Sequence, residues 1–576
     1  METVQKQERT KQMRYKEDHG QYDLCIIGGG PAGIILAMEY ARANPGRQVL
    51  LVEYGSKKQG STNRLDDSIE IRNKLNHHDP YDCTNKGIGG SSATWGGRCV
   101  MYDESDFIQR PIVNEGCTWP PGIWEEIQKF QQQAASYFEC GRPIFNLSSM
   151  PGIVAGSIAE NFRKNAVLED TVIERWSMPT RFGKRYAKEM ANLPNLYVMQ
   201  GYEARNFTAP DAHGKVGALY IRATNDPSAL IMINALQFVL AAGAQENTRI
   251  LLRNTILFRR LGFTPPALGR YYQGHLSGKI ASVRFKGDPR KTDYGFLRDI
   301  DGTYIRRRFQ FSAAFLTANN LLNTAIWLDN PLYYDPKHRS GAMSFMYLAM
   351  LIPILGKKLA PPAIAHSITN GKKTNISKHL ANILRELPGS LLTPASIFFR
   401  RYCMKRKLPG VFLYSPKNQY ALHFHAEQVP HTGNRMELAN DGETLQITYG
   451  LTKADIDSVI QLHKVLDEQL RAMGCGELEY WYPAAALPEA IRNMSKDGLH
   501  QCGTTRIADT PENGVVDAHL KLWGTNNIYV CSSSVFPTSG QANPTFLLGV
   551  FAVRLAAHLG NLEKATTRPQ VETVTL

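Results

Sequence analysis

The chain has 576 residues, of which 43% are hydrophobic and 20% charged; this is typical of a globular protein with two or more domains and excludes a disordered or fibrous one. The formal net charge is +14, but the basic residues are not concentrated in a recognisable nucleic-acid-binding module, so we expect no nucleic-acid partner. The nine cysteines form no CxxC pair, which favours reduced thiols over a disulfide framework or a zinc site. Residues 1–20 are polar and lack an apolar signal segment, so we expect a disordered tail and a cytoplasmic location.

The first predicted unit, over residues 22–53, is a strand, a glycine-rich turn, a helix and a second strand. Its turn has the spacing Gly28-x-Gly30-x-x-Gly33. Gly28 permits the sharp turn, Gly30 lets the backbone approach a pyrophosphate, and Gly33 lets helix and strand pack closely. Glu53 ends the second strand, 20 residues past Gly33, and can accept hydrogen bonds from an adenosine ribose. The pattern predicts a dinucleotide site rather than an ordinary βαβ turn.

Two further segments are candidates for contact with the same ligand. Residues 87–98 hold five glycines in twelve residues, which lets backbone N–H groups approach a flat ring or a pyrophosphate. The alternative is a flexible surface loop, although Trp95 and Arg98 are poor choices for a linker. The strand that ends at Gly243 turns into a helix and offers a second approach from the same sheet. The predicted contacts are Gly89, Gly90, Ser91, Ser92, Thr94, Trp95, Gly96, Gly97, Ala242 and Gly243.

Residues 341–410 are expected to form a helical insertion. The apolar run 342–355 is too short to span a bilayer, and a densely basic stretch, 400–407, follows a second apolar run at 391–399. One interpretation is an insertion that packs on the body and exposes a solvated basic face. The other is a patch over 341–407 that lies on an anionic membrane, apolar side down. We prefer the first, so a peripheral membrane location is the alternative.

The predicted strand over 419–427 carries His423, His425 and Glu427 on one face, because strand side chains alternate. His425 and Glu427 are candidates for a polar wall that faces the substrate. An ordinary sheet face is the plainer interpretation, and a metal site is the least favoured, so we expect no metal. An amphipathic helix over 452–473 follows, with Thr452 as its N-cap.

The C-terminal segment is the richest in polar loops that contain glycine. His500 lies three residues before Gly503, and a predicted strand over 527–531 leads into a loop that contains Asn543. A lone histidine is more often structural than catalytic, but its pairing with Asn543 favours a catalytic role. The predicted cofactor contacts here are Ser532, Ser533, Asn543 and Thr545.

Together these segments resemble the glucose–methanol–choline (GMC) family of FAD oxidoreductases. The likeness covers both ends of the chain and residues 239–252, whereas the middle, from about 276 to 480, matches only loosely. The motif Phe-Pro-Thr-Ser-Gly-x-Ala-Asn-Pro-Thr, over 536–545, is most similar to the pyranose oxidase branch and its bacterial relatives. Pyranose oxidases can attach flavin through a histidine directly before the tryptophan of the glycine-rich loop. This chain has Thr94 before Trp95, so the resemblance implies non-covalent FAD.

The resemblance also implies the chemistry. An alcohol passes hydride to flavin N5 only when its hydroxyl proton leaves, and His500 occupies the place of the family's catalytic base. Asn543 occupies the second polar position and can donate a hydrogen bond to the developing alkoxide. We expect an FAD-dependent oxidase or dehydrogenase for a hydroxyl of a sugar, glycoside or polyol-like compound, with oxygen or another electron acceptor. The alternatives are oxidation of a lipidic or polycyclic alcohol at a membrane surface, and a non-catalytic flavoprotein subunit for electron transfer.

The expected fold class is α/β with an α+β substrate domain: a Rossmann-type FAD-binding domain with an inserted antiparallel-sheet substrate domain. Both ends of the chain build the first domain, because the nucleotide-binding and catalytic motifs lie there. The FAD-binding domain is expected over 21–115, 195–275 and 486–576, and the substrate-binding domain over 116–194 and 276–485.

Overall fold

The computed structural model describes residues 20–56, 68–113, 116–151, 156–352 and 374–566. The tail predicted at 1–20 lies almost wholly outside these residues. The N-terminal unit forms as expected, with strand β1, helix α1 and strand β2, and Leu24 of β1 pairs in parallel with Val49 of β2. The bounds are β1 (Tyr22–Ile27), α1 (Pro31–Ala43) and β2 (Val49–Glu53).

The parallel core of the first sheet has the strand order β7-β2-β1-β10-β20. Strand β10 is 15 residues long and serves two sheets. Its C-terminal half pairs in parallel with β1, and its N-terminal half forms an antiparallel meander with β9 and β8. A parallel sheet joined by a crossover helix is the Rossmann arrangement, so the predicted class is confirmed. The added bounds are β7 (Leu196–Gln200), β8 (Tyr202–Phe207), β9 (Ala218–Ala223), β10 (Asp226–Leu240) and β20 (Ile528–Val530).

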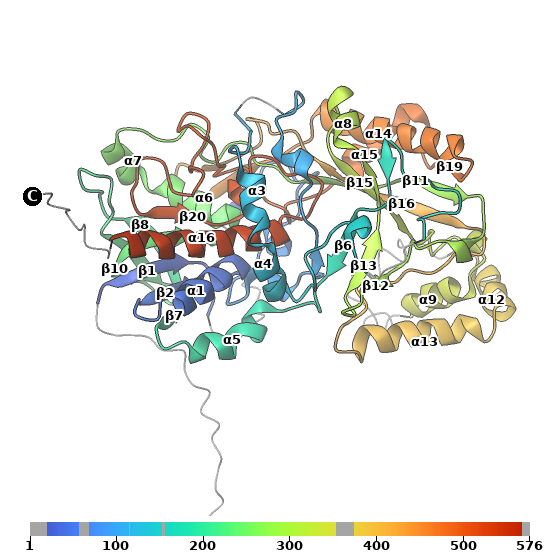
Figure 1. Ribbon diagram of the computed structural model, residues 1–576, viewed down its shortest axis with the longest axis horizontal. Helices are drawn as coiled ribbons and strands as arrows, with labels where there is room; N and C mark the ends of the chain where they lie inside the picture. Colours follow the sequence, from blue (N-terminus) through green and yellow to red (C-terminus); the bar gives the residue numbers. More distant parts are fainter. Residues whose placement is uncertain (1–19, 57–67, 114–115, 152–155, 353–373, 567–576) are drawn as a thin grey trace, which may run out of the picture.

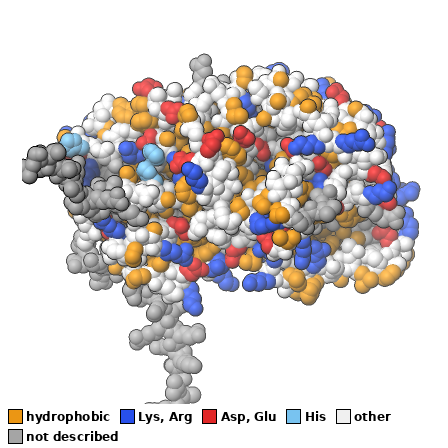
Figure 2. All heavy atoms as spheres, in the orientation of Figure 1, with side chains coloured by type: hydrophobic (Ala, Val, Ile, Leu, Met, Phe, Trp, Pro, Cys, Tyr) orange, Lys and Arg blue, Asp and Glu red, His pale blue; other side chains and the backbone are white. Residues whose placement is uncertain are grey.

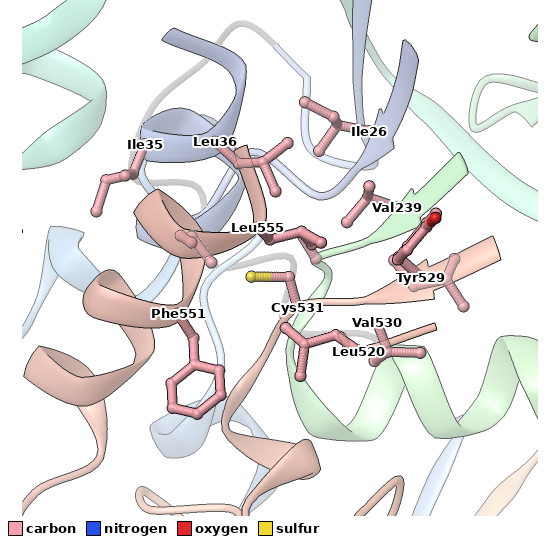
Figure 3. Close-up of a cluster of buried hydrophobic side chains, with 14 of the residues drawn as sticks. Ile26, Ile35, Leu36, Val239, Leu520, Tyr529, Val530, Cys531, Phe551 and Leu555 are labelled. Carbon is pink, nitrogen blue, oxygen red and sulfur yellow. The ribbon is translucent and has the colours of Figure 1, made fainter. Parts of the chain in front are cut away.

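The last helix, α16 (Thr545–Thr566), lies against α1 over this sheet (Figure 1). Its Phe551 and Leu555 point into the same cluster as Leu36 of α1 and Val239 of β10 (Figure 3). Residues 545–562 are the one stretch among the described residues long and apolar enough to cross a membrane, yet 67% of it is buried in the fold. Helix α16 is therefore a core helix of the first domain.

The second domain is built on an antiparallel sheet with the strand order β19-β11-β16-β15-β14-β5, on the right in Figure 1. The long helix α14 packs on this sheet and begins at the predicted cap, where the Thr452 side chain accepts from the backbone of Asp455. The predicted antiparallel substrate-domain sheet is confirmed. The bounds are β5 (Leu168–Glu169), β11 (His275–Phe285), β14 (Phe309–Phe311), β15 (Thr324–Asp329), β16 (Gln419–Glu427), α14 (Lys453–Ala472), β19 (Gly476–Tyr480) and α15 (Leu487–Met494).

Two small sheets join the domains. One has the order β12-β13-β6-β4 and the other β17-β18-β3. The first brings the glycine-rich loop, through β4, against the substrate domain, because Arg98 pairs with Trp176 of β6. Their bounds are β3 (Ile69–Ile71), β4 (Arg98–Cys99), β6 (Ile173–Trp176), β12 (Leu297–Arg298), β13 (Tyr304–Arg307), β17 (Arg435–Leu438) and β18 (Leu445–Thr448).

The domain boundary predicted at 116–194 needs correction. Helices α3 and α4 pack against α16, and Phe138 of α4 is fully buried with Phe182 of α5 in the core of the first domain. Their apolar faces complete that core, which the sequence order did not reveal. The bounds of the helices outside the sheets are α2 (Pro80–Cys83), α3 (Ile123–Gln128), α4 (Gln131–Phe138), α5 (Phe182–Asn192), α6 (Gly243–Arg253), α7 (Thr255–Leu261) and α8 (Ala313–Ala318).

The described part of the insertion at 341–410 is helical, as predicted. Helices α9 (Gly341–Leu351), α12 (Ile376–Arg385) and α13 (Gly389–Tyr402) lie together at the lower right of Figure 1. Residues 353–355 of the predicted apolar run lie outside the described residues.

Candidate active site

The glycine-rich turn borders a cavity at the carboxyl ends of the parallel strands. A Cβ at Gly33 would collide with the carbonyl oxygen of Gly28, so this glycine serves close helix–strand packing. A Cβ at Gly30 would meet no protein atom within 4 Å, so the space beside this backbone is open to a ligand. Gly30 is the N-cap of α1, where backbone N–H groups have no partner within the helix. The geometry suits an anionic group such as a pyrophosphate.

Glu53 joins three backbone segments at the wall of this cavity. Its carboxylate accepts hydrogen bonds from the N–H groups of Gly29 (2.7 Å), Gly55 (2.9 Å) and Gly87 (2.7 Å). A carboxylate has about four acceptor positions, so one remains for a ligand hydroxyl. The side chain therefore holds the turn and the glycine-rich loop together, and its predicted ribose contact stays a prediction.

The glycine-rich loop docks on the turn. The N–H of Gly89 donates to the carbonyl of Gly29 at 2.7 Å, and Gly90 and Ser91 line the cavity. Ser92 and Trp95 instead anchor the loop: the Ser92 hydroxyl donates to the Gly89 carbonyl at 2.5 Å, and the Trp95 ring packs in the aromatic core. The loop is thus fixed rather than flexible.

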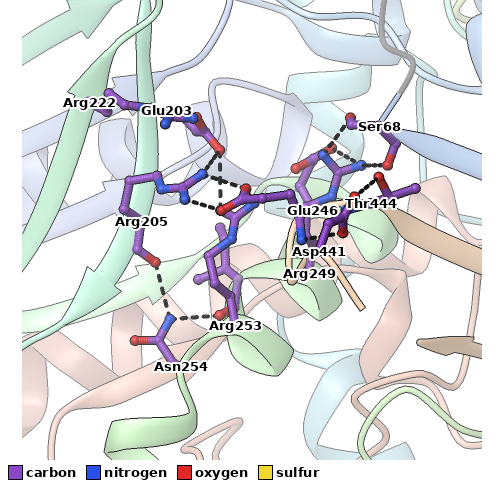
Figure 4. A network of polar contacts seen from close by, with 12 residues as sticks. Ser68, Glu203, Arg205, Arg222, Glu246, Arg249, Arg253, Asn254, Asp441 and Thr444 are labelled. Carbon is purple, nitrogen blue, oxygen red and sulfur yellow. Dashed lines mark hydrogen bonds and ion pairs between the residues drawn. The ribbon is translucent and has the colours of Figure 1, made fainter. Parts of the chain in front are cut away.

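A charged network fixes another part of the cavity wall (Figure 4). Glu203 lines the cavity and pairs with Arg205 (2.9 Å), Arg222 (2.6 Å) and Arg253 (3.2 Å). Burial would raise the pKa of Glu203, but the hydrogen bonds and charges of these arginines hold it below its usual value. Glu203 therefore stays anionic and rigid at neutral pH.

Ten of the predicted cofactor residues line this cavity, and the other eight do not. Sequence reasoning missed Tyr54 and Lys86, which also line it and form a cation–π pair at 4.0 Å. The position of Tyr54 directly after Glu53 is the one signal that pointed to it. The predicted residues in the wall are Gly28, Gly30, Glu53, Gly90, Ser91, Ala242, Gly243, Ser532, Ser533 and Thr545; those outside it are Gly33, Gly89, Ser92, Thr94, Trp95, Gly96, Gly97 and Asn543.

His500 and Asn543 meet at the end of this cavity. The Asn543 side-chain amide donates to His500 Nε2 at 2.6 Å. Their chain neighbours Leu499, Gln501 and Pro544 line the cavity. Because Nε2 accepts this bond, the proton of a neutral His500 lies on Nδ1 and the lone pair of Nε2 points toward Asn543. An alcohol oxygen at this point would contact a base and a hydrogen-bond donor together.

A buried carboxylate stands behind the base. Asp497 Oδ2 lies 3.5 Å from Nδ1 of His500 and 3.5 Å from Nδ1 of His275. Burial would raise the pKa of Asp497, but the two imidazoles hold it well below its usual range. Neither residue was predicted from the sequence: Asp497 precedes His500 by three positions, which was the available signal, whereas His275 comes from the distant strand β11.

His425 faces the same place. Its Nδ1 donates to the carbonyl of Gln541 at 2.6 Å, so the lone pair of the neutral ring is on Nε2. Burial and the charges of His275 and Arg98 hold the pKa of His425 well below its usual value. Ligand nitrogens of His275, His425 and His500 lie within 4.8 Å of one another. The arrangement can exchange protons and accept hydrogen bonds from a polar substrate.

The other two polar residues on this face of β16, Glu427 of the predicted wall and His423, have partners within the protein. Glu427 is fully buried and forms two hydrogen bonds of 2.6 Å with Arg110. His423 hydrogen-bonds Ser277 at 2.8 Å and stacks on Trp327. The structure therefore assigns Glu427 to an internal ion pair rather than to a substrate wall, and it does not bring His423, His425 and Glu427 together as a metal site.

The cavity fits FAD. It offers an open cradle at Gly30 on a helix N-terminus, a free acceptor position on Glu53, and a polar end at Ser532 and Ser533 next to the His500–Asn543 pair. These residues would hold a dinucleotide, and its flavin would supply the hydride acceptor for chemistry at His500.

Comparisons with known proteins agree with this assignment. Residues 430–552 match the family model described as GMC oxidoreductase. Pyridoxine 4-oxidase from Microbacterium luteolum is 24% identical over 579 residues, which cover 90% of this chain and 95% of the relative. The fold is similar to that of a fungal aryl-alcohol oxidase (TM-score 0.50, 15% identity, 94% of this chain and 99% of the other). It is also similar to an FAD-dependent oxidoreductase from Chaetomium thermophilum (TM-score 0.51, 15% identity, 94% and 100%).

The Rossmann-type domain, the antiparallel substrate domain and the paired histidine and asparagine define a flavin-dependent oxidoreductase. Its C-terminal part is similar to the GMC oxidoreductase family, and we assign the chain as an oxidase or dehydrogenase that acts on CH–OH donors.

Proposed function

We propose that this enzyme oxidises a hydroxyl of a sugar, glycoside or polyol-like compound to a carbonyl with non-covalent FAD, with His500 as the base. The observation that carries the proposal is the 2.6 Å contact between Asn543 Nδ2 and His500 Nε2 at the end of the cofactor cavity. A binding subunit needs no base at this position, which argues against the electron-transfer alternative.

The His500 side chain takes up the hydroxyl proton. Its Nε2 lone pair accepts the proton as the C–H bond breaks, so charge does not build up on the carbinol carbon. The imidazole then carries a positive charge, and Asp497 stabilises it from 3.5 Å. FAD, when bound, supplies the hydride acceptor. Oxygen or another electron acceptor would complete the cycle.

Asn543 acts on the oxygen. Its amide N–H donates to His500 Nε2 at 2.6 Å; an alcohol oxygen that enters between the two side chains would take over this hydrogen bond and leave the Nε2 lone pair for the hydroxyl proton. As the hydroxyl loses its proton, the oxygen becomes more negative and this hydrogen bond strengthens. Asn543 therefore stabilises the transition state more than the bound alcohol.

The groups around this position support a polar substrate. His425 offers a lone pair on Nε2, and Arg98 lies over the Trp327 ring at 4.2 Å beside it. Acceptors and donors of this kind suit a compound with several hydroxyls. The likeness of residues 536–545 to the pyranose oxidase branch supports the same class, whereas the relatives compared above are named for pyridoxine and an aryl alcohol.

A second candidate is a lipidic alcohol. Exposed apolar side chains on α12 and α13 favour it, because they offer a surface on which such a substrate is concentrated.

The test is anaerobic bleaching of the flavin absorbance by a panel of sugars, glycosides, polyols and lipidic alcohols. It reports flavin reduction whatever the electron acceptor. Bleaching by a sugar, glycoside or polyol supports the proposal. Bleaching by lipidic alcohols alone supports the second candidate instead. The absence of bleaching by any alcohol contradicts both candidates.

A further inference from the structure

Helix α12 is amphipathic with its polar side inward. Its buried side chains are His379 and Asn382. Its apolar residues Ile376, Leu380 and Leu384 are 50%, 49% and 68% exposed, and they recur every four residues along one stripe. A helix that packs on a globular body normally buries such a stripe.

Hydrogen bonds fix this orientation. His379 Nδ1 lies 3.0 Å from the hydroxyl of Ser344 on α9, and the Asn382 amide donates to the carbonyl of Pro336 at 2.9 Å. Burial lowers the pKa of His379, so the ring is neutral at pH 7. Rotating the helix to bury its leucines would expose these bonds, so the outward apolar stripe is a built feature.

Helix α13 continues the same face. Ser390 is its one buried residue, whereas Leu392 and Phe399 are 63% and 56% exposed. Ten of the 21 exposed large hydrophobic side chains of the described residues lie between 376 and 404, which sets this surface apart from the rest of the molecule. We call it the 376–404 face; hydrophobic side chains gather in its place along the lower right edge of Figure 2. Its exposed members are Ile376, Leu380, Leu384, Leu387, Leu391, Leu392, Phe398, Phe399, Tyr402 and Met404.

The same segment is strongly basic. Residues 374–407 hold seven basic side chains and one acidic one, Glu386, a net charge of +6. Within the described residues, none of the seven forms an ion pair, and the arginines that do bond reach carbonyl or hydroxyl oxygens, as Arg401 and Arg406 do. These charges are uncompensated. The basic residues are Lys378, Arg385, Arg400, Arg401, Lys405, Arg406 and Lys407.

We propose that the 376–404 face lies on an anionic lipid bilayer. Apolar and aromatic side chains beside uncompensated lysines and arginines match the acyl boundary and the anionic headgroups of such a surface. A second copy of this chain is a poorer occupant, because pairing the two faces would bring +6 against +6. The proposal takes the alternative to our preferred interpretation, an insertion that packs on the body with a solvated basic face, and it does not depend on the identity of the substrate.

The test measures co-sedimentation of the purified, flavin-loaded protein with vesicles. Wild-type protein should bind vesicles that contain phosphatidylglycerol at low salt, bind pure phosphatidylcholine vesicles less, and dissociate at high salt. Replacing Lys378, Lys405 and Lys407 by Gln should weaken binding about 10²-fold at low salt. These lysines are exposed, so the fold should be unaffected.

Two matched triple variants compare the effect on vesicle binding of apolar side chains on the 376–404 face with that of exposed apolar side chains elsewhere. L384Q/L392Q/F399Q should lower vesicle binding by at least about 10²-fold. L230Q/I256Q/I300Q replaces side chains that are 59%, 57% and 67% exposed elsewhere and should leave binding unchanged.

A label reports the contact directly. Cys403 is exposed and the other eight cysteines are buried, so an environment-sensitive dye on Cys403 should shift to the blue with anionic vesicles. The proposal is overturned if the protein ignores vesicles, if it binds neutral and anionic vesicles equally, or if L384Q/L392Q/F399Q still binds. It is also overturned if that variant dissolves a dimer, because the face would then join two copies. Flavin content and melting temperature should be equal in all variants, so failure here is distinct from failure of the proposed reaction.

Discussion

Replacing Asp497 by Asn should slow alcohol oxidation, because the protonated form of the base, His500, loses the carboxylate that stabilises it. Asp497 Oδ2 lies 3.5 Å from His500 Nδ1, and the carboxylate is almost fully buried. Two unit charges at this distance attract by about 5 kcal/mol at an effective dielectric constant of 20 and by about 1 kcal/mol in bulk water. Since Asp497 divides its charge between His275 and His500, we expect a loss of about 2.7 kcal/mol, or about 10² in rate.

The assay is stopped-flow reduction of the bound flavin under anaerobic conditions. The rate constant at saturating alcohol should fall about 10²-fold while the apparent dissociation constant of the alcohol changes little. Asp455→Asn is the control, since Asp455 is buried at the start of α14 and contacts backbone groups away from His500. A wild-type rate of flavin reduction in Asp497→Asn would show that this carboxylate does not support the base.

Three further predictions concern the same machinery and its scaffold. Asn543→Ala should reduce the rate of flavin reduction about 10²–10³-fold with flavin content unchanged, measured by the same stopped-flow assay. Gly30→Ala should fold normally but bind FAD more weakly by titration, because its Cβ enters open space, whereas Gly33→Ala should lower the melting temperature because its Cβ meets the Gly28 carbonyl. Burial lowers the pKa of His463 to about 4, so the folded ring is neutral while the unfolded ring takes up a proton below about 6.5. This stability is full above pH 6.5 and is lost as the pH falls toward 4; the free energy of unfolding should drop by about 2 kcal/mol at pH 5 and by less in His463→Gln, measured with denaturant.

Local patterns were enough to predict the first domain. The apolar runs and the glycine-rich turn predicted the strand, turn and helix at 22–53, because the Gly28–Gly33 spacing allows few other structures. His500 and Asn543 were found from their short motifs, and the structure brings them within 2.6 Å.

The remaining features depend on partners that are distant in sequence. The alternation of side chains predicted both His425 and Glu427 correctly in a strand. The Glu427 carboxylate, however, forms an ion pair with Arg110, 317 residues away. His275 reaches Asp497 from another strand of the chain. The helical character of residues 341–410 was predicted, but the side of α12 that faces inward was not, because it is set by His379 and Asn382, whose partners lie on other elements.

The most direct test of His500 as the catalytic base is the rate of anaerobic flavin reduction by an alcohol in His500→Ala. His519→Ala is the matched control, because His519 stacks on His558 outside the site. We predict that His500→Ala keeps its FAD and loses about 10²–10⁴-fold in rate, while the control is unchanged. Flavin reduction at a near wild-type rate in His500→Ala would contradict the assignment of His500 as the base.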